Sequence, residues 1–192
     1  MIFYLASPKE AAEIAQIHKR EIKEGFLSSL PLVFLKKLYT CVIKNDFCVL
    51  AKEGNEIIGF IAGTMDVAKL YSFFLKRYLF YSVLILFPKV FNLLSLKKIT
   101  ETLFYPKYEK ELPKAELLTI AVKNDFQGQG IAKKMFEVFI LEMETRKAKV
   151  FKVLVGEKLK PAISFYEKSG FELLKETEIH QGQKSRIYIY KI

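Results

Sequence analysis

A strand-like run at residues 117–122 leads through a loop with two glycines into a helical pattern, and no other part of the chain constrains the fold as strongly. The run is short and nearly continuous in apolar character, as expected of a strand buried on both faces. After the loop, apolar residues recur at helical spacing at Ile131, Met135, Phe136, Phe139, Ile140 and Met143. A second apolar run at 150–155 follows the predicted helix. A strand, a helix and a strand in this order predict a parallel pair joined by a crossover.

The loop at residues 127–132 has the features of an anion-binding turn. Backbone N–H groups in the first turn of a helix lack an internal partner, and the helix dipole puts partial positive charge there, so a phosphate can bind without a basic side chain. Gly128 and Gly130 let a ligand approach the main chain closely. A plain turn before a helix is the alternative. The loop is neither a dinucleotide fingerprint, since Lys133 stands where a third glycine is needed, nor a Walker loop.

Two motifs in the correct order resemble those of a known family, the GCN5-related N-acetyltransferases. The family hallmark is Gln/Arg-x-x-Gly-x-Gly/Ala between the fourth strand and the next helix, and residues 127–132 read Gln-Gly-Gln-Gly-Ile-Ala. About thirty residues further on, residues 161–171 resemble the family's Ala-x-x-x-Tyr-x-x-x-Gly-Phe helix. One position departs from the pattern, because many members carry Asn where this chain has Leu159.

The resemblance implies an α/β fold, the acyl-CoA N-acyltransferase (GNAT) fold, in which helices flank a mixed central sheet. We expect a single N-acetyltransferase domain over residues 1–192, with a helical insertion at 64–115 between the third and fourth strands. The fourth and fifth strands are expected to splay apart, as they do in the family. The implied cofactor is acetyl-coenzyme A, and no metal is expected.

Local patterns predict the remaining elements. Ser7, Pro8 and Glu10 mark a helix start after a short strand at residues 2–6. The apolar side of this helix is expected to comprise Ala11, Ile14, Ala15, Ile17 and Ile22. A second helix from Pro31 is expected to bury Val33, Phe34, Leu38, Val42 and Ile43. Antiparallel hairpins are predicted over residues 47–63 and 173–190.

The family pattern assigns cofactor-binding and catalytic roles to residues of both motifs. The pyrophosphate of acetyl-coenzyme A is expected on the backbone amides of Gln127, Gly128, Gln129, Gly130, Ile131 and Ala132. The pantetheine arm is expected to pair with the backbone of Ile120, Ala121 and Val122. The acceptor amine would attack the thioester directly, and a backbone N–H near Val122 would stabilise the oxyanion. Tyr166 is expected to donate a proton to the departing thiolate, the alternative being a core aromatic residue.

The general base and the acceptor contacts are open at this point. Glu116, just before the central strand, and Glu24, between the first two helices, are candidate bases by position, as is His18. The family builds its variable pocket from the first interhelical loop and neighbouring insertions. The acceptor contacts expected from this are Gly25, Phe26, Leu27 and Ser28, with the segment 71–81.

The segment between residues 64 and 115 is too long for an ordinary connection between strands. It includes ten uncharged residues at 78–87, about half the length that a bilayer-spanning helix needs. We expect two or three helices here that pack on the domain and wall the acceptor pocket. The alternatives are a homodimer interface and peripheral membrane contact through residues 70–95.

The chain is basic, with a formal net charge of +10. Residues 69–110 carry eight Lys and Arg against two Glu, so more than half of the excess lies in the insertion. Such a surface suits a nucleotide-linked substrate, an anionic membrane or nucleic acid, although lysine used for solubility explains it equally well. Nucleic acid is disfavoured because no recognised binding motif accompanies the charge.

Two cysteines, Cys41 and Cys48, lie in apolar surroundings, and the N-terminus has no signal-peptide pattern. Buried thiols in a reducing cytoplasm are the expected reading, with a catalytic cysteine as the alternative. The favoured function is an acetyl-coenzyme A dependent N-acetyltransferase acting on a small amine, a nucleotide-linked amino sugar, a polyamine or a protein amino group. The competing functions are a non-catalytic module that binds acetyl-coenzyme A and a membrane-surface interaction protein.

Overall fold

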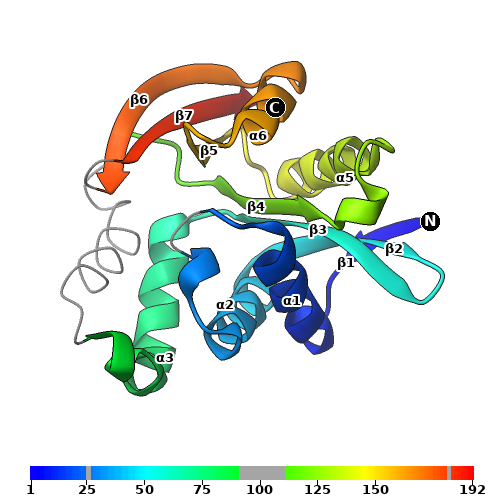
Figure 1. Ribbon diagram of the computed structural model, residues 1–192. Coiled ribbons are helices and arrows are strands. Elements are labelled where there is room, and N and C mark those ends of the chain that lie inside the picture. The colour runs from blue at the N-terminus through cyan, green and yellow to red at the C-terminus, as the bar shows by residue number, and fades with distance from the viewer. Residues whose placement is uncertain (25–26, 91–110, 181–182) are drawn as a thin grey trace.

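The computed structural model describes residues 1–24, 27–90, 111–180 and 183–192, and it contains a seven-stranded mixed sheet (Figure 1). The order of strands across the sheet is β1-β2-β3-β4-β5-β7-β6. The strands are β1 Ile2–Leu5, β2 Phe47–Glu53, β3 Glu56–Thr64, β4 Glu116–Val122, β5 Val150–Gly156, β6 Glu172–His180 and β7 Gln183–Lys191. Neighbouring strands are antiparallel except β4 and β5, which are parallel. The predicted mixed sheet and its one parallel crossover are confirmed.

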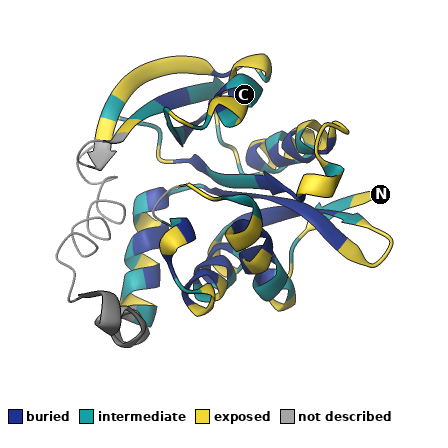
Figure 2. Cartoon of the chain, viewed as in Figure 1, coloured by how far each residue is buried: buried dark blue, intermediate teal, exposed yellow. Residues whose placement is uncertain are grey.

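Helices cover both faces of the sheet (Figure 1). One face carries α1 Ala11–Glu21, α2 Leu32–Asn45 and α3 Val67–Val90, and the other carries α5 Ile131–Thr145 and α6 Lys160–Lys168. Short 3-10 turns occur at Pro8–Glu10, Leu27–Ser29 and Asn124–Phe126. Buried residues line the helix sides that meet the sheet, and exposed residues line the outer sides (Figure 2).

The core is divided by the sheet into two clusters. Leu35 and Phe60 belong to the cluster under α1–α3, whereas Phe139 and Phe151 belong to the cluster under α5 and α6. Burying each such side chain stabilises the fold by roughly 1.5–3 kcal/mol. Helix α5 lies so close to β3 that a Cβ at Gly63 would come 2.5 Å from the Phe139 ring. A side chain at Gly63 would therefore push α5 off the sheet.

The helix start predicted at Ser7, Pro8 and Glu10 is confirmed, whereas one burial prediction in the second helix is wrong. The Glu10 carboxylate accepts the N–H of Ser7 at 2.7 Å, and this closes a capping box over the turn at Pro8. The apolar side of α1 faces the core as expected. In α2, however, Val33 is 55% exposed, so the prediction that it is buried was wrong. It lies in the first turn of the helix, on the side away from the residues that face the sheet.

The insertion begins with one long helix, α3 Val67–Val90. Its first half packs on α2, since the Phe74 and Phe34 rings lie 5.2 Å apart and Leu70 is buried. Residues 91–110, which include part of the predicted membrane-contact segment 70–95, lie outside the described residues. Among the helices that are described, none has the length and apolar character needed to cross a bilayer.

Candidate active site

The parallel pair β4–β5 is joined over only two positions. Glu116 pairs with Lys152 and Leu117 with Val153, whereas the other edge of β4 makes six pairs with β3. Leu118 is an extra residue in that second ladder, because Gly63 pairs with Leu117 and Ala62 with Thr119. From residue 118 onward the two parallel strands diverge. We call the edge of β4 at residues 118–122, where it faces β5 without ladder pairs, the strand opening.

The apolar run 117–122 was expected to be buried on both faces, and this is wrong for its middle residues. Leu118, Thr119 and Ile120 are half-buried, although the residues at both ends of β4 are buried. The expected pantetheine-binding residues Ile120, Ala121 and Val122 therefore lie on a strand with one edge free. An extended chain could pair with this edge as a strand does.

The glycine loop, residues 127–132, follows directly from this strand through the turn at Asn124–Phe126. Gly128 and Gly130 have φ of 76° and 75°, and Gly130 is the N-cap of α5. A Cβ built at either glycine would meet nothing within 4 Å, so the space in front of the loop is open. The first N–H of α5 with an acceptor in the helix end is that of Lys134, which donates to the Gly130 carbonyl at 3.1 Å. The N–H groups of Ile131, Ala132 and Lys133 precede it and are available to an anion, whereas the Gln127 N–H, expected to bind the pyrophosphate, donates to the Asn124 carbonyl at 3.1 Å.

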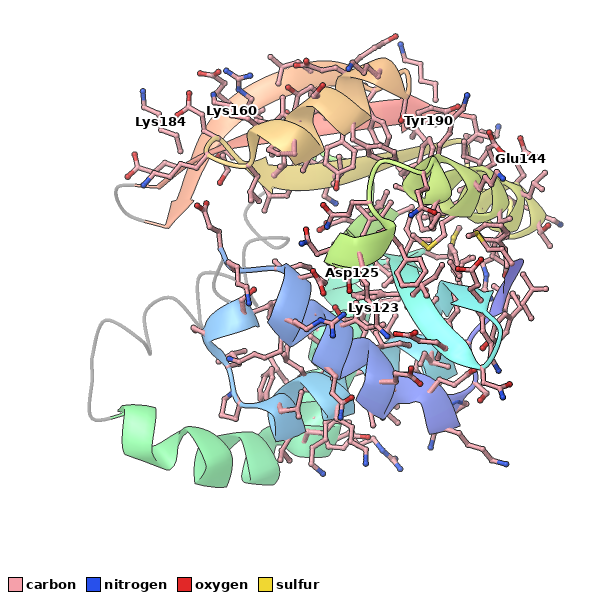
Figure 3. The ribbon with its side chains drawn as sticks, turned by 45° about the vertical axis from the view of Figure 1, so that its right-hand side comes forward. Lys123, Asp125, Glu144, Lys160, Lys184 and Tyr190 are labelled. Atoms are coloured by element: carbon pink, nitrogen blue, oxygen red, sulfur yellow. The ribbon has the colours of Figure 1, made fainter. Side chains whose placement is uncertain are left out.

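Side chains hold the glycine loop against the end of β4. The Nε2 of Gln127 donates to the Val122 carbonyl at 2.9 Å, so this side chain shapes the loop. Lys123 is fixed to β3 by its N–H, which donates to Ile58, and by a 2.5 Å ion pair with Glu56. Figure 3 labels Lys123 where β4 ends and the chain turns toward α5. The nine predicted cofactor-binding residues thus lie along the end of β4 and the glycine loop, and their contact with a cofactor stays a prediction.

Tyr166 lies on α6 and is 5% exposed. Its ring contacts Phe165 and Phe171 at centroid distances of 5.6 and 5.2 Å. Burial raises the pKa of the Tyr166 hydroxyl, which keeps it protonated at neutral pH. Leu159, in place of the family's Asn, is the N-cap of α6 and packs its side chain against the same cluster. The start of α6 therefore has no polar cap from this residue.

A buried ion pair lies where β4 and β5 part. Glu116 and Lys152 are 5% and 2% exposed, and Oε2 lies 3.2 Å from Nζ. Lys152 also donates to the Pro113 carbonyl. The candidate base Glu116 is thus held by a cation that the sequence analysis missed, although a lysine inside the apolar run 150–155 was the available signal.

Tyr71 lies beside this ion pair, at the start of the segment predicted to contact the acceptor. It packs with Val67 against Leu118 and Leu154, from the two diverging strands. Burial raises the pKa of Tyr71, and the negative charge of Glu116 adds to that effect. The first turns of α3 therefore pack against the sheet at the strand opening, and the expected contact of this segment with the acceptor stays a prediction.

Lys19 of α1 binds the C-terminal part of the first interhelical loop. Lys19 Nζ donates to the carbonyls of Ser28 at 2.5 Å and of Leu30 at 3.0 Å. Ser28 is buried, Leu27 is half-buried, and the candidate base Glu24 is exposed. Gly25 and Phe26, predicted to contact the acceptor, lie outside the described residues.

His18 is buried between this loop and α2, which sequence reasoning did not foresee. Its Nδ1 lies 2.5 Å from the Tyr39 hydroxyl and its Nε2 lies 3.4 Å from Ser28 Oγ. Burial, with a smaller contribution from the Lys19 charge, lowers the pKa of His18 to about 4. The imidazole is therefore neutral at physiological pH, with both nitrogens engaged inside the protein.

Both cysteines of the chain lie inside the fold. Cys41 and Cys48 are buried and free, as predicted. Burial raises the pKa of Cys41 to about 11 and raises that of Cys48 further, so both remain thiols and the catalytic-cysteine alternative loses support. In the part of the chain that is described, no group of His, Cys, Asp and Glu side chains could hold a metal ion.

Comparison with known proteins gives a family and a fold. Residues 12–171 match the profile of the Acetyltransferase (GNAT) family. Curated protein sequences give no match. Solved structures similar to the chain include ribosomal-protein-alanine N-acetyltransferase from Brucella melitensis, with 11% identity, full coverage of both chains and a TM-score of 0.64. Another is yncA from Salmonella typhimurium, solved with its cofactor acetyl-CoA, with 11% identity, 100% and 93% coverage and a TM-score of 0.61. An N-acetyltransferase from Staphylococcus aureus has 16% identity, 99% and 100% coverage and a TM-score of 0.59.

Proposed function

Because the chain belongs to the acetyltransferase (GNAT) family, we propose that it transfers an acetyl group from acetyl-coenzyme A to a primary amine by direct attack in a ternary complex. The observation that carries this proposal is the junction of the strand opening with the glycine loop. A free strand edge at residues 118–122 continues within a few residues into the N-terminus of α5. Acetyl-coenzyme A has an extended polar arm that suits the strand edge and a pyrophosphate that suits the helix start.

The residues present fit acetyl-coenzyme A. The N–H groups at the start of α5 would hold the pyrophosphate, with the helix dipole adding positive potential. The open space in front of Gly128 and Gly130 leaves room for the phosphates. The backbone of Ile120 to Val122 would pair with the pantetheine arm, and an N–H near Val122 would stabilise developing negative charge. The cofactor supplies a thioester whose carbonyl an amine can attack.

Two side chains are proposed to move protons. Tyr166, kept protonated by burial, would donate its hydroxyl proton to the departing sulfur. Glu116 is the better placed of the candidate bases, since it lies on β4 next to the strand opening, whereas the Glu24 side chain is exposed on a loop. Its ion pair with Lys152 favours the carboxylate form that a base requires.

The acceptor is proposed to be a small amine, a nucleotide-linked amino sugar or a protein amino group. The Brucella melitensis relative is named for acting on ribosomal-protein alanine, and this supports including peptides among the tested acceptors. The chain's net charge of +10 supports including anionic, nucleotide-linked amines.

A thiol-release assay with acetyl-coenzyme A across polyamines, amino sugars and short peptides tests the activity. At least one amine should increase thiol release over the amine-free rate. The variant Tyr166→Phe should lose about 10²-fold or more in kcat, the usual size of a general-acid contribution, while calorimetry shows unchanged binding of acetyl-coenzyme A. Binding without amine-dependent release by the wild type would favour the non-catalytic module, an alternative based on Leu159 in place of the Asn that contacts the cofactor in many family members.

A further inference from the structure

Helices α2 and α3 pack together on one face of the sheet, and both carry exposed apolar side chains on their outer sides (Figure 1). Val33 of α2 is 55% exposed and Phe73 of α3 is 42% exposed. Leu32, in the first turn of α2, is 41% exposed. Single exposed apolar residues are common on protein surfaces, so the groups around these three decide whether they form an interaction surface.

Both helices place cations one turn after an exposed apolar residue. Residues at i, i+3 and i+4 share one side of a helix. The two sets with this spacing are Val33 with Lys36 and Lys37, and Phe73 with Lys76 and Arg77. All of these side chains are exposed except that of Lys37, which is half-buried. We call these six residues the basic face of α2 and α3.

The two sets adjoin where the helices touch. The Phe34 and Phe74 rings, each one residue after the exposed apolar residue of its helix, lie 5.2 Å apart. Lys37 of α2 reaches across to α3, where its Nζ lies 5.2 Å from the centre of the Tyr78 ring. The cations of the two helices therefore belong to one surface.

On α3 this surface is turned away from the strand opening. Tyr71 packs toward the strand opening, and Phe74 packs into the core under α2. Because successive residues of a helix are about 100° apart, Phe73 lies beyond Phe74 and nearly opposite Tyr71. One side of α3 thus lies against the candidate active site, and the other carries the basic face.

Neither helix has an acidic residue to balance these cations, since α2 and α3 contain no Asp or Glu. The nearest carboxylates along the chain lie just outside the helix ends. Asp46 accepts the Thr64 hydroxyl at 2.8 Å, and Asp66 Oδ2 lies 3.8 Å from Lys69 Nζ. Both carboxylates are engaged at those ends, so the two helices give the surface between them a positive potential.

We propose that the basic face binds the anionic surface of a lipid bilayer. Lipid phosphates would meet the cations, while Leu32, Val33 and Phe73 enter between the headgroups, as the apolar side of an interfacial helix does. This inference goes beyond the proposed function, because it assigns a second binding surface on the outer side of α3. It holds whichever amine the active site accepts.

Other partners suit the basic face less well. A second copy of the chain, related by a two-fold axis through the face, would bring like charges together. Nucleic acid would engage the cations but would give the aliphatic side chains of Leu32 and Val33 nothing to bind. A bilayer offers both chemistries, since its phosphates lie directly above acyl chains. The sequence of α3 continues without charge over residues 78–87, which also favours an apolar partner.

Sedimentation of the full chain with lipid vesicles at low salt tests the proposal. The chain should pellet with vesicles of equal parts phosphatidylglycerol and phosphatidylcholine, and should bind phosphatidylcholine alone at least about tenfold more weakly. Replacing Lys36, Lys76 and Arg77 together with Gln should weaken binding to the anionic vesicles about 10²-fold, since each cation near an anionic surface contributes about fivefold. Absence of binding, or equal binding to both kinds of vesicle, would overturn the proposal.

A matched control removes the same charge from the opposite side of the sheet. Lys147, Lys149 and Lys168 are exposed in or near α5 and α6. Replacing these three with Gln should leave binding to the anionic vesicles within about twofold of the wild type, because exposed charges beyond a Debye length are largely screened. Equal losses in the two triple variants would show that net charge alone causes binding, and the basic face would then have no special role.

The apolar contribution is tested with Val33→Ser and Phe73→Ser combined, which should weaken binding to the anionic vesicles about tenfold. Leu141→Ser combined with Leu173→Ser is the control, since both leucines are exposed on other elements. Thermal unfolding should show that all variants fold, because their substitutions lie at exposed positions. Unchanged vesicle binding by the first pair would mean that charge acts alone, and the proposal would fail.

Light scattering without vesicles tests the face as a contact between copies. The wild type and the Val33→Ser, Phe73→Ser variant should have the same mass in solution. A dimer that these two substitutions dissociate would assign the basic face to a second copy of the chain and overturn the proposal.

Discussion

The two faces of the sheet are built from different chemistry. Under α5 and α6 the interior is aromatic, with Phe136, Phe151 and Phe171 in mutual ring contact. Under α1–α3 the interior also contains polar groups, including His18 and the Glu116–Lys152 ion pair. Burying polar and charged groups costs stability unless each finds a partner. The aromatic face therefore supplies stability, whereas the polar face gives up some stability to place chemical groups next to the strand opening.

The largest loss of stability is expected on the aromatic face. Phe139→Ala should lower the free energy of unfolding by about 3–5 kcal/mol, because Phe139 is fully buried and its removal leaves a cavity. Chemical denaturation measures this. Leu141→Ala, at a 61% exposed position of the same helix, should change stability by less than about 0.5 kcal/mol. Similar losses for both variants would show that the buried rings of this face do not supply its stability.

On the polar face, removing one partner of the ion pair should destabilise the fold more than replacing both partners. Lys152→Met leaves the Glu116 carboxylate buried without its cation and should lower the free energy of unfolding by about 3 kcal/mol at neutral pH. Combining it with Glu116→Gln should recover part of that loss. Denaturation of the two single variants and the double variant measures the coupling. If the double variant loses as much as the sum of the single variants, the pair is not energetically coupled.

Lowering the pH should reduce the stability of the fold through His18, which lies on the polar face. Its pKa is about 4 in the fold against 6.5 as the ordinary value, so the unfolded chain binds a proton first as the pH falls. Stability is therefore lost below pH 6.5 and the loss is complete below about pH 4, amounting to about 2 kcal/mol between pH 7 and 5. His18→Gln should flatten the dependence in this range. An unchanged slope in denaturation curves at pH 7, 6 and 5 would show that His18 does not cause it.

The smallest expected effect is a loss of acetyl-coenzyme A affinity on replacing Gly130, which an ordinary turn would not show. Gly130→Ala puts a Cβ into the open space in front of the loop and should weaken acetyl-coenzyme A binding about tenfold in calorimetry, or about 1.4 kcal/mol. Gly54→Ala is the matched control in the β2–β3 turn, since Gly54 also has positive φ and open space around it. Both variants should lose about 1 kcal/mol of stability from backbone strain, because the left-handed region disfavours a side chain. Equal affinity of the two variants would argue against a phosphate site at Gly130.

The elements that a local pattern defines were predictable from the sequence. The strand, glycine loop and helix over residues 117–145 followed from periodicity and glycine placement, and the structure confirms their order. The separation of β4 and β5 was expected from the family resemblance and is observed, but local patterns could not predict that it leaves Leu118 to Ile120 half-buried, because this depends on where β5 stops pairing with β4. The contact of His18 with Tyr39 was missed for a similar reason. His18 and Tyr39 are twenty-one residues apart, and only the packing of α1 on α2 brings them together.

The strand opening also bears on how the sheet keeps its shape. With two ladder pairs between β4 and β5, the backbone alone would form a weak joint between strands β1–β4 and strands β5–β7. One ring bridges that joint from α5, because Phe139 contacts Phe47 of β2 at 5.1 Å and Phe151 of β5 at 5.4 Å. These ring contacts lie under the end where β4 and β5 are still paired. The protein can thus leave residues 118–122 of β4 unpaired with β5, because aromatic packing at the paired end strengthens the joint between the two groups of strands.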